Sequence, residues 1–468
     1  MKSVPQAHLA AQVVQAFQTV LCEAPEQLER STGLLTRKRK ITGATLAQTL
    51  VLGWLRNPAA GMGELAQQAG EVGLQVSATA LEKRMTRRTA NFLLALWEVA
   101  LGQVVLADPV SLGLLNRFSA VCLEDSTTIA LPAELADLFR GNGGKASPAA
   151  CKVFVRLDML RGQLTCSPLQ HGRCADGKSP LAQVEVPTRT LHLRDRGFSN
   201  LERWAQEEAR QEWVLSYLRS DVQVFAEDGT PLVLESSLPS LGERGTLRVL
   251  VGKQQFPMRL FFERVSEEVA EHRRKKMRVE KQEQGQSVSA RSSALAAWNI
   301  AVTTVPEDLL DWHEALVLLR LRWQIELLFR LWKDQGQGDV WHSLKPERML
   351  CELLAKLLGF LIQHWMLVVS CWHDPHRSLF KAARAFRQQI ALLSTALAGA
   401  WSLQAAVERI LSVIGVGARV SLRRDAPTTS QMLVMGTNRW SDRPLRPWTR
   451  HRAKRPWKPT NRPKPCSS

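Results

Sequence analysis

The sequence lacks the patterns that mark several common classes of protein. Its eight cysteines are scattered, and none forms a C-x-x-C pair. This argues against a disulfide framework and a zinc site, and it fits a reducing cytosol. The N-terminus has no signal-peptide pattern. A basic membrane-surface protein is the alternative for a chain of this charge, but it would need a Lys/Arg-rich amphipathic helix, which is also missing. We therefore expect a cytoplasmic protein.

No long hydrophobic run is free of polar residues. The most apolar window is residues 353–372, and Lys356, Gln363 and His364 interrupt it. A membrane-spanning helix needs about 20 consecutive, predominantly apolar residues. The window therefore predicts a buried helix in a bundle, and we expect no membrane partner.

Acidic residues are in the minority. The chain has 44 Asp and Glu against 62 Lys and Arg, which gives a net charge of +18. Its 468 residues, 45% of them hydrophobic, predict two or three domains with a substantial core. A large globular chain of this charge usually binds a polyanion, and nucleic acid is the leading candidate.

The first 105 residues predict an all-helical domain. A helix from residue 61, a glycine-containing turn and a second helix at 78–88 capped by Ser77 form a helix-turn-helix pattern. The second helix is basic and carries Lys83, Arg84, Arg87 and Arg88. Two helices joined by a glycine turn also occur in any all-α domain. The charge favours a DNA-binding domain over residues 1–105, with these four side chains as DNA contacts.

From residue 106 the pattern changes to that of an α/β domain. We expect strands at 118–125, 152–158, 163–168, 190–195 and 213–218, and a helix at 199–212. Asp125 and Asp195 each lie at the end of a predicted strand. Strands followed by a helix and a further strand indicate the first part of an α/β core, over residues 106–221.

A mostly β insertion is expected next, over residues 222–296. Its predicted strands are 222–225, 247–251 and 258–262, and a basic linker follows at 273–281. A strand at 298–304 then returns the chain to the second part of the core, residues 297–375. A C-terminal helical region is expected at 376–438. The segment 439–468 is basic and Pro-rich, so we expect it to be disordered or extended and able to touch DNA nonspecifically.

One predicted helix, residues 319–333, combines an apolar and a charged stripe. Pro306 can stand at its start and Gly336 just past its end. The apolar stripe holds Leu318, Leu321, Ile325, Leu328 and Trp332. The charged stripe, roughly 110° around the helix, holds Arg322, Glu326, Arg330 and Lys333. These charges are either solvated i,i+4 pairs or a carboxylate that holds a metal among cations that hold phosphates.

Three acids stand out by position. Asp125 and Asp195 end strands of the same α/β domain, and Glu326 lies on a helix that follows it. Acids at strand ends and on a nearby helix can meet at one edge of a sheet. Such a group suits two Mg²⁺ ions that clamp the attacking and leaving oxygens of a phosphodiester.

At these residues the chain resembles the DDE transposases of bacterial insertion sequences, in the family numbered four. That family has a YREK signature, and Arg322, Glu326 and Lys333 stand at its spacing, with Leu319 in the position of the Tyr. Segments around both aspartates are also similar to the family: residues 124–128, 195–198 and, more weakly, 141–144. The resemblance covers residues 60–375.

The resemblance implies an RNase H-like core, a mixed sheet with helices, interrupted by the insertion and flanked by helical regions. It implies a cut-and-paste DNA transposase that uses Mg²⁺ or Mn²⁺, held by Asp125, Asp195 and Glu326. Double-stranded DNA at element ends and target DNA would be its partners, bound by a dimer that pairs the ends. Arg322, Lys333 and Arg330 would contact phosphates.

Two tryptophans are candidates for contacts with DNA bases. Trp298 begins the strand that leads to the charged helix, and Trp323 lies on that helix. In relatives that form a DNA hairpin, a Trp in this neighbourhood accepts a displaced base; the alternative is a core tryptophan.

Two other functions remain open from the sequence. One is a catalytically silent, transposase-derived repressor, which Leu319 favours because it lacks the hydroxyl of Tyr. The other is a metal nuclease without strand transfer.

Overall fold

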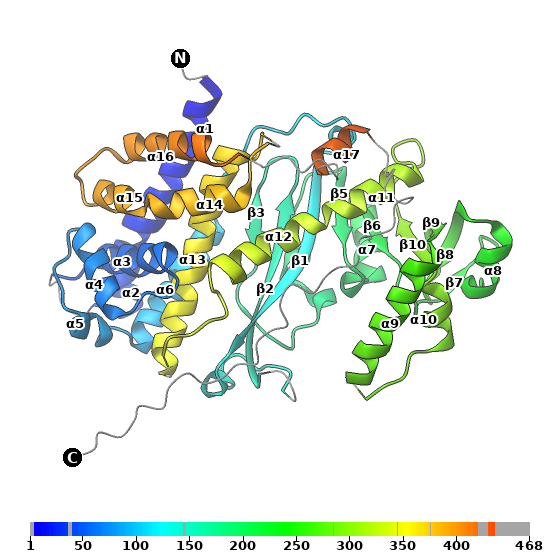
Figure 1. Cartoon of the computed structure of the whole chain (residues 1–468), viewed down its shortest axis with the longest axis horizontal. Coiled ribbons are helices and arrows are strands. Elements are labelled where there is room, and N and C mark those ends of the chain that lie inside the picture. Colours follow the sequence, from blue (N-terminus) through cyan, green and yellow to red (C-terminus); the bar gives the residue numbers. More distant parts are fainter. Residues whose placement is uncertain are drawn as a thin grey trace.

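The structure is a computed structural model that describes residues 4–35, 40–143, 147–283, 285–343, 345–374, 376–419 and 429–435. The basic tail predicted at 439–468 lies outside the described residues. Figure 1 shows three regions in a row: a block of helices at the left, a sheet in the middle, and an extension of that sheet covered by helices at the right.

The helical block unites the two ends of the chain around one long helix, α13 (Pro346–Cys371), which contacts helices from both ends (Figure 1). The N-terminal helices are α1 (Val4–Gln18), η1 (Thr19–Glu23), α2 (Ala24–Ser31), α3 (Gly43–Arg56), α4 (Met62–Glu71), α5 (Ala78–Glu82) and α6 (Arg87–Leu101). The helices that follow α13 in this block are α14 (Leu379–Gln388), α15 (Ile390–Leu397) and α16 (Leu403–Gly417). Helix α17 (Thr429–Met435) lies outside the block and contacts α11 (Trp312–Leu321) (Figure 1). The apolar window of α13 is wholly buried inside the protein, so α13 is a core helix, as the sequence predicted.

The predicted helix-turn-helix differs from the structure in its second helix. The basic stretch 78–88 is not one helix, because α5 ends at Glu82 and Thr86 caps a new helix, α6. The Thr86 hydroxyl accepts a hydrogen bond from the amide of Thr89, which is typical of a helix N-terminus. Lys83 and Arg84 therefore lie between the two helices, and Arg87 and Arg88 lie in the first turn of α6.

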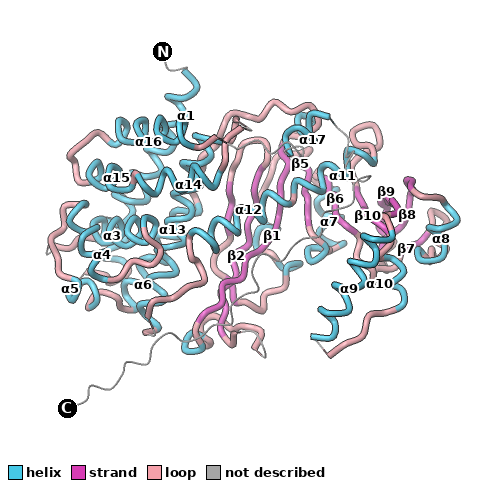
Figure 2. Tube along the Cα trace, in the orientation of Figure 1, coloured by secondary structure: helices cyan, strands magenta, loops and turns pink. Residues whose placement is uncertain are grey.

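The sheet is mixed, with strand order β3-β2-β1-β5-β6-β10-β9-β8-β7, and β4 pairs with β2 outside this path (Figure 2). Strand β1 is antiparallel to β2 and parallel to β5, and β5 is parallel to β6. The part of the sheet formed by strands β1 to β6, with its helices, is consistent with an RNase H-like core. Its strands are β1 (Ala120–Leu131), β2 (Ala149–Asp158), β3 (Leu164–Cys166), β4 (Gln170–His171), β5 (Thr190–Arg194) and β6 (Trp213–Tyr217); helix α7 (Leu201–Ala209) joins β5 to β6.

The predicted insertion extends this same sheet and is not mostly β. Strand β10 (Trp298–Thr303) pairs with both β6 and β9, so the strands of the insertion continue the core sheet. The insertion contains β7 (Val224–Phe225), α8 (Leu234–Leu241), β8 (Arg244–Val251), β9 (Phe256–Arg264), α9 (Glu267–Glu283) and α10 (Ala290–Leu295). The predicted basic linker 273–281 lies inside α9. Acidic residues one and two turns away support this helix, since Arg274 pairs with Glu271 and Glu267.

The predicted charged helix is divided into three helical segments. It starts at Trp312, capped by Asp311, and not near Pro306. The segments are α11 (Trp312–Leu321), α12 (Trp323–Arg330) and the π-helix η7 (Leu331–Gln335), and Gly336 ends the last one as predicted. Helix α12 crosses the sheet over β1 (Figure 1). Its charged side chains are therefore held against the strand that carries Asp125.

Candidate active site

The strand register brings the two aspartates to the same end of the sheet. Glu124 on β1 and Arg194 on β5 are direct partners in a parallel pair, and Asp125 and Asp195 each follow by one residue. Glu326 comes from α12, which lies over β1. The three acids predicted from the sequence thus come from two adjacent strands and the helix above them.

All three carboxylates approach one guanidinium group, that of Arg322. The Arg322 nitrogens lie 3.6 Å from Asp125 Oδ2, 3.7 Å from Asp195 Oδ2 and 3.1 Å from Glu326 Oε1. Arg322 is the residue between α11 and α12, so the break in the helix lies at the centre of the site. A site in which three carboxylates share one cation fits a divalent metal ion, which prefers carboxylate oxygens.

Asp125 is the most enclosed of the three acids. Burial raises the pKa of its carboxyl to about 6, although the amide of Ser126 and the Arg322 guanidinium both act to lower it. The neighbouring Asp195 carboxylate raises it further. Burial is thus the main cause of the raised pKa of Asp125.

The structure places the other charged residues of the helix beside this site. The Arg330 guanidinium lies 4.6 Å from the centre of the Trp323 ring, and both side chains are exposed. Lys333 donates a hydrogen bond of 3.0 Å to the backbone oxygen of Thr128 on β1. Leu319, in contrast, is only 3% exposed and packs in the hydrophobic core.

The structure contradicts the prediction that Trp298 is available to a DNA base. Its side chain is 6% exposed and packs against Phe262, with 6.0 Å between the ring centres. It belongs to the core that the inserted strands share with β6 and β10. The alternative of a core tryptophan is therefore correct for Trp298, whereas Trp323 on α12 is exposed.

Sequence reasoning missed a further acid at the site, Asp176. Its carboxylate accepts a hydrogen bond of 2.7 Å from the Ser126 hydroxyl and lies 3.2 Å from Lys152 Nζ. Its charge helps to raise the pKa of Asp125. Asp176 lies in a loop, in the short 3-10 helix η4 (Asp176–Lys178), and no periodic pattern of the sequence marks it.

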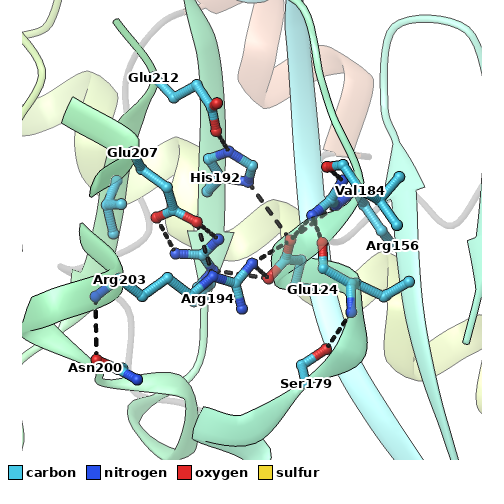
Figure 3. Close-up of polar contacts among 12 residues, drawn as sticks. Glu124, Arg156, Ser179, Val184, His192, Arg194, Asn200, Arg203, Glu207 and Glu212 are labelled. Atoms are coloured by element: carbon cyan, nitrogen blue, oxygen red, sulfur yellow. Dashed lines mark hydrogen bonds and ion pairs between the residues drawn. The ribbon is translucent and has the colours of Figure 1, made fainter. Parts of the chain in front are cut away.

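A buried ionic network on the other face of the sheet was also missed. Glu124, which precedes Asp125, contacts Arg156, Arg194 and Arg203 (Figure 3). Burial by itself raises the pKa of Glu124, but these three guanidinium groups hold it well below its usual range. Glu124 is therefore a charged group in the interior.

The same network contains a second potential metal-binding group, His192, Glu207 and Glu212. Its oxygens already have partners. Arg194 donates to both oxygens of Glu207, and His192 contacts Glu212 (Figure 3). Arg210 also donates to Glu212. A metal ion here would have to displace buried guanidinium groups. We assign this group to the ionic network, because its oxygens are already held by hydrogen bonds.

The predicted DNA contacts of the N-terminal region lie far from these acids along the chain but close to one another. Lys83, Arg87 and Arg88 are exposed and Arg84 is half-buried. No acidic residue lies in the first turn of α6, so Arg87 and Arg88 meet the positive end of its dipole, which is unfavourable. Two cations at this position indicate a role other than stability.

The mixed sheet with its helices is consistent with the core of transposases that have a DDE domain. A family model described as "Transposase DDE domain" matches residues 117–362, more than half of the chain, and the protein belongs to this family. It is 26% identical over 363 residues to the transposase for insertion sequence element IS231B of Bacillus thuringiensis subsp. berliner, which covers 72% of this chain and 75% of the relative. It is likewise 26% identical over 353 residues to the transposase for IS421 of Escherichia coli, covering 72% and 90%.

These relatives establish the class of reaction. The protein is a DNA transposase of the insertion-sequence type, and the resemblance seen in the sequence is confirmed at this level. DDE transposases use divalent metal ions and bind DNA at the ends of their elements.

Proposed function

We propose that Asp125, Asp195 and Glu326 together bind Mg²⁺ or Mn²⁺ and that this site cuts and joins DNA at the ends of an insertion sequence by a cut-and-paste route. The observation that supports this is the approach of all three carboxylates to the Arg322 guanidinium. A bound metal ion would generate the attacking hydroxide and stabilise the leaving 3′ oxygen.

Cationic side chains on α12 and η7 would hold the DNA beside the acids. We propose that Arg322, Arg330 and Lys333 contact phosphates, because they lie along the segment that carries Glu326. An arginine provides a planar fork that suits phosphate oxygens, whereas a lysine acts as a point charge. We propose that the protein acts in the bacterial cytoplasm, as a dimer when it is bound to paired ends.

An assay with the natural DNA distinguishes the three functions that the sequence left open. The full-length protein is incubated with its own gene and flanking DNA in the presence of Mg²⁺, and the products are separated on a gel. We expect excised element and joined products. Cutting without joining would indicate a nuclease, and binding without cutting a repressor. Leu319 no longer favours the repressor, since this position lies in the core.

We propose that the N-terminal cations bind element-end DNA. In the full-length protein, changing Arg87 and Arg88 to Gln should weaken binding and reduce the salt dependence of the affinity by about one unit of slope per lost phosphate contact. Stability should rise slightly, by about 0.3–1 kcal/mol, because cations leave the positive end of a helix. Gel shifts over a range of salt concentrations and thermal unfolding test both parts.

The matched control for this pair removes two exposed cations elsewhere. Arg244 and Lys253 lie on β8 and in the following turn, at the other end of the molecule in Figure 1. Changing both to Gln alters the net charge equally. If this control weakens end binding as much as the Arg87/Arg88 pair does, the effect is one of general charge and the assignment of the N-terminal contacts is wrong.

We propose that Trp323 stacks on a DNA base near the cut. It is 41% exposed, and Arg330 lies over its ring. Stacking of a base on an aromatic ring contributes about 1–3 kcal/mol. Trp323→Ala should therefore slow a step after the first nick by about tenfold or more while the rate of the first nick is kept. Equal loss at every step, with a lowered melting temperature, would show that Trp323 is structural.

A further inference from the structure

The ionic network of Glu124 begins one residue before each catalytic aspartate. Glu124 is the register partner of Arg194 on β5 and of Arg156 on β2, so the three form one row across adjacent strands. Side chains alternate between the two faces of a sheet. The row Arg156–Glu124–Arg194 therefore lies on the face opposite to Asp125 and Asp195.

Short contacts hold this row together. The Nε of Arg194 donates to Glu124 Oε2 at 2.8 Å, and the Nε of Arg156 donates to Glu124 Oε1 at 2.8 Å (Figure 3). Each of these three side chains is at most 5% exposed. Charged side chains therefore join strands β2, β1 and β5 on the face of the sheet opposite to Asp125 and Asp195.

Two side chains of helix α7, Arg203 and Glu207, also bind this row. Both oxygens of Glu207 accept hydrogen bonds from Arg194, at 2.6 and 2.5 Å. Arg203, also on α7, donates to Glu124 at 2.8 Å and to Glu207 at 2.8 Å. A guanidinium group that donates two parallel hydrogen bonds to a carboxylate can adopt only a narrow range of orientations. Such contacts therefore give geometric precision.

Stability alone is a weak reason for so many buried charges. Apolar side chains of similar volume would fill this space at no loss, because desolvation offsets most of the attraction within a buried ion pair. Fixing the register between β1 and β5 is a stronger reason for these buried charges. A slip of one residue between β1 and β5 would place one aspartate on the wrong face of the sheet, and it would also separate Glu124 from Arg194.

We infer that Glu124 and Arg194 are positioning residues, which set the separation and direction of Asp125 and Asp195 as metal ligands from the opposite face of the sheet. This inference rests on the proposed metal site. Metal ligands function only within about 0.5 Å of their required positions. Groups that hold ligands in place typically contribute about 10–100-fold to metal affinity.

Arg194→Lys tests this in the full-length protein, because lysine keeps the charge and loses the fork. Binding of Mn²⁺ is measured by electron paramagnetic resonance without DNA, well below the melting temperature. We expect Mn²⁺ affinity to fall about 10–100-fold, end-DNA binding to stay unchanged, and nicking to recover at high Mn²⁺ concentration. A purely structural residue would not give this recovery.

The matched control is Arg259→Lys. Arg259 is a buried arginine of the same sheet, on β9, and it donates to the backbone oxygens of Val305 and Leu310, away from the three acids. An unchanged Mn²⁺ affinity in folded Arg194→Lys, or an equal loss in Arg259→Lys, would overturn the inference.

Two further variants separate the possible failures. Asp125→Asn should abolish Mn²⁺ binding; if it does not, the proposed metal site itself is wrong. If Arg194→Lys does not fold, Arg203→Lys gives the same test from α7. Unfolding of both, with Arg259→Lys intact, would assign the network to stability and overturn the inference.

Discussion

Replacing any one of the three acids, as Asp125→Asn, Asp195→Asn or Glu326→Gln, is expected to abolish Mg²⁺-dependent nicking of element-end DNA. The three carboxylates share one cation in the structure, so the loss of one ligand should disable the whole site. We expect a loss of at least about 10³-fold for each, and little further loss when a second acid is changed, since groups that act as a unit are not additive. Nicking assays on single and double variants measure this.

Binding and stability provide the controls for these variants. End-DNA binding in a gel shift should survive each change. Burial raises the folded-state pKa of Asp125 above its ordinary value, so the ionised group lowers the stability of the protein at pH values above that pKa. Asp125→Asn should therefore leave the free energy of unfolding level or raise it. Wild-type nicking by Asp195→Asn or Glu326→Gln would show that the three-acid site is wrong.

Arg322→Ala is expected to change metal binding and DNA cleavage in opposite directions. Without DNA, the guanidinium occupies the space between the three carboxylates that a metal ion would need. Its removal deletes three partly exposed ion pairs of about 0.5 kcal/mol each, so Mn²⁺ affinity should rise about tenfold. Nicking should nevertheless fall about 10²-fold, because a cation beside the reacting phosphate is lost. Titration with Mn²⁺ and a nicking assay measure the two effects.

The control for Arg322 is Arg330, the arginine at the other end of α12. Arg330→Ala removes the same charge, but Arg330 lies over Trp323 and not among the acids. It should leave Mn²⁺ affinity without DNA unchanged. A tighter site in both variants would mean that only the net charge matters, and an unchanged affinity in Arg322→Ala would contradict the competition between Arg322 and the metal ion.

Local patterns in the sequence predicted a strand at each aspartate and a helix at Glu326. The structure has these elements, but β1 continues to Leu131, so Asp125 lies within its strand and not at the end, and the helix is divided into three segments. The predicted apolar stripe of this segment is buried, as Leu318, Ile325 and Trp332 show. The apolar window of α13 was likewise correctly predicted as a core helix, because interior Lys and His are incompatible with a lipid-facing surface. These features depend on near neighbours along the chain.

The predictions that the structure contradicts concern residues with contacts to partners that are distant in the chain. The charged segment 273–281 was predicted as a linker, but its arginines are held in α9 by Glu267, Glu271 and groups near β10. Trp298 was a candidate for DNA contact, but β9 supplies Phe262 and encloses it. Phe262 and the groups near β10 are distant in the chain from the residues they contact and cannot be predicted from a local window, whereas Glu267 and Glu271 lie 7 and 3 residues from Arg274.

By itself the sequence predicted the class of protein, which the family model confirms, and it proposed Asp125, Asp195 and Glu326 as the acids of the site, because their spacing and flanking residues resemble the transposase family. Only the tertiary structure decided that Arg322 stands between these acids, that Asp176 lies beside them, and that a row of buried charges ties the two aspartate strands together behind the site. The physical reason is strand register: Glu124 and Arg194 are 70 residues apart in the chain and meet only when β1 and β5 pair in parallel.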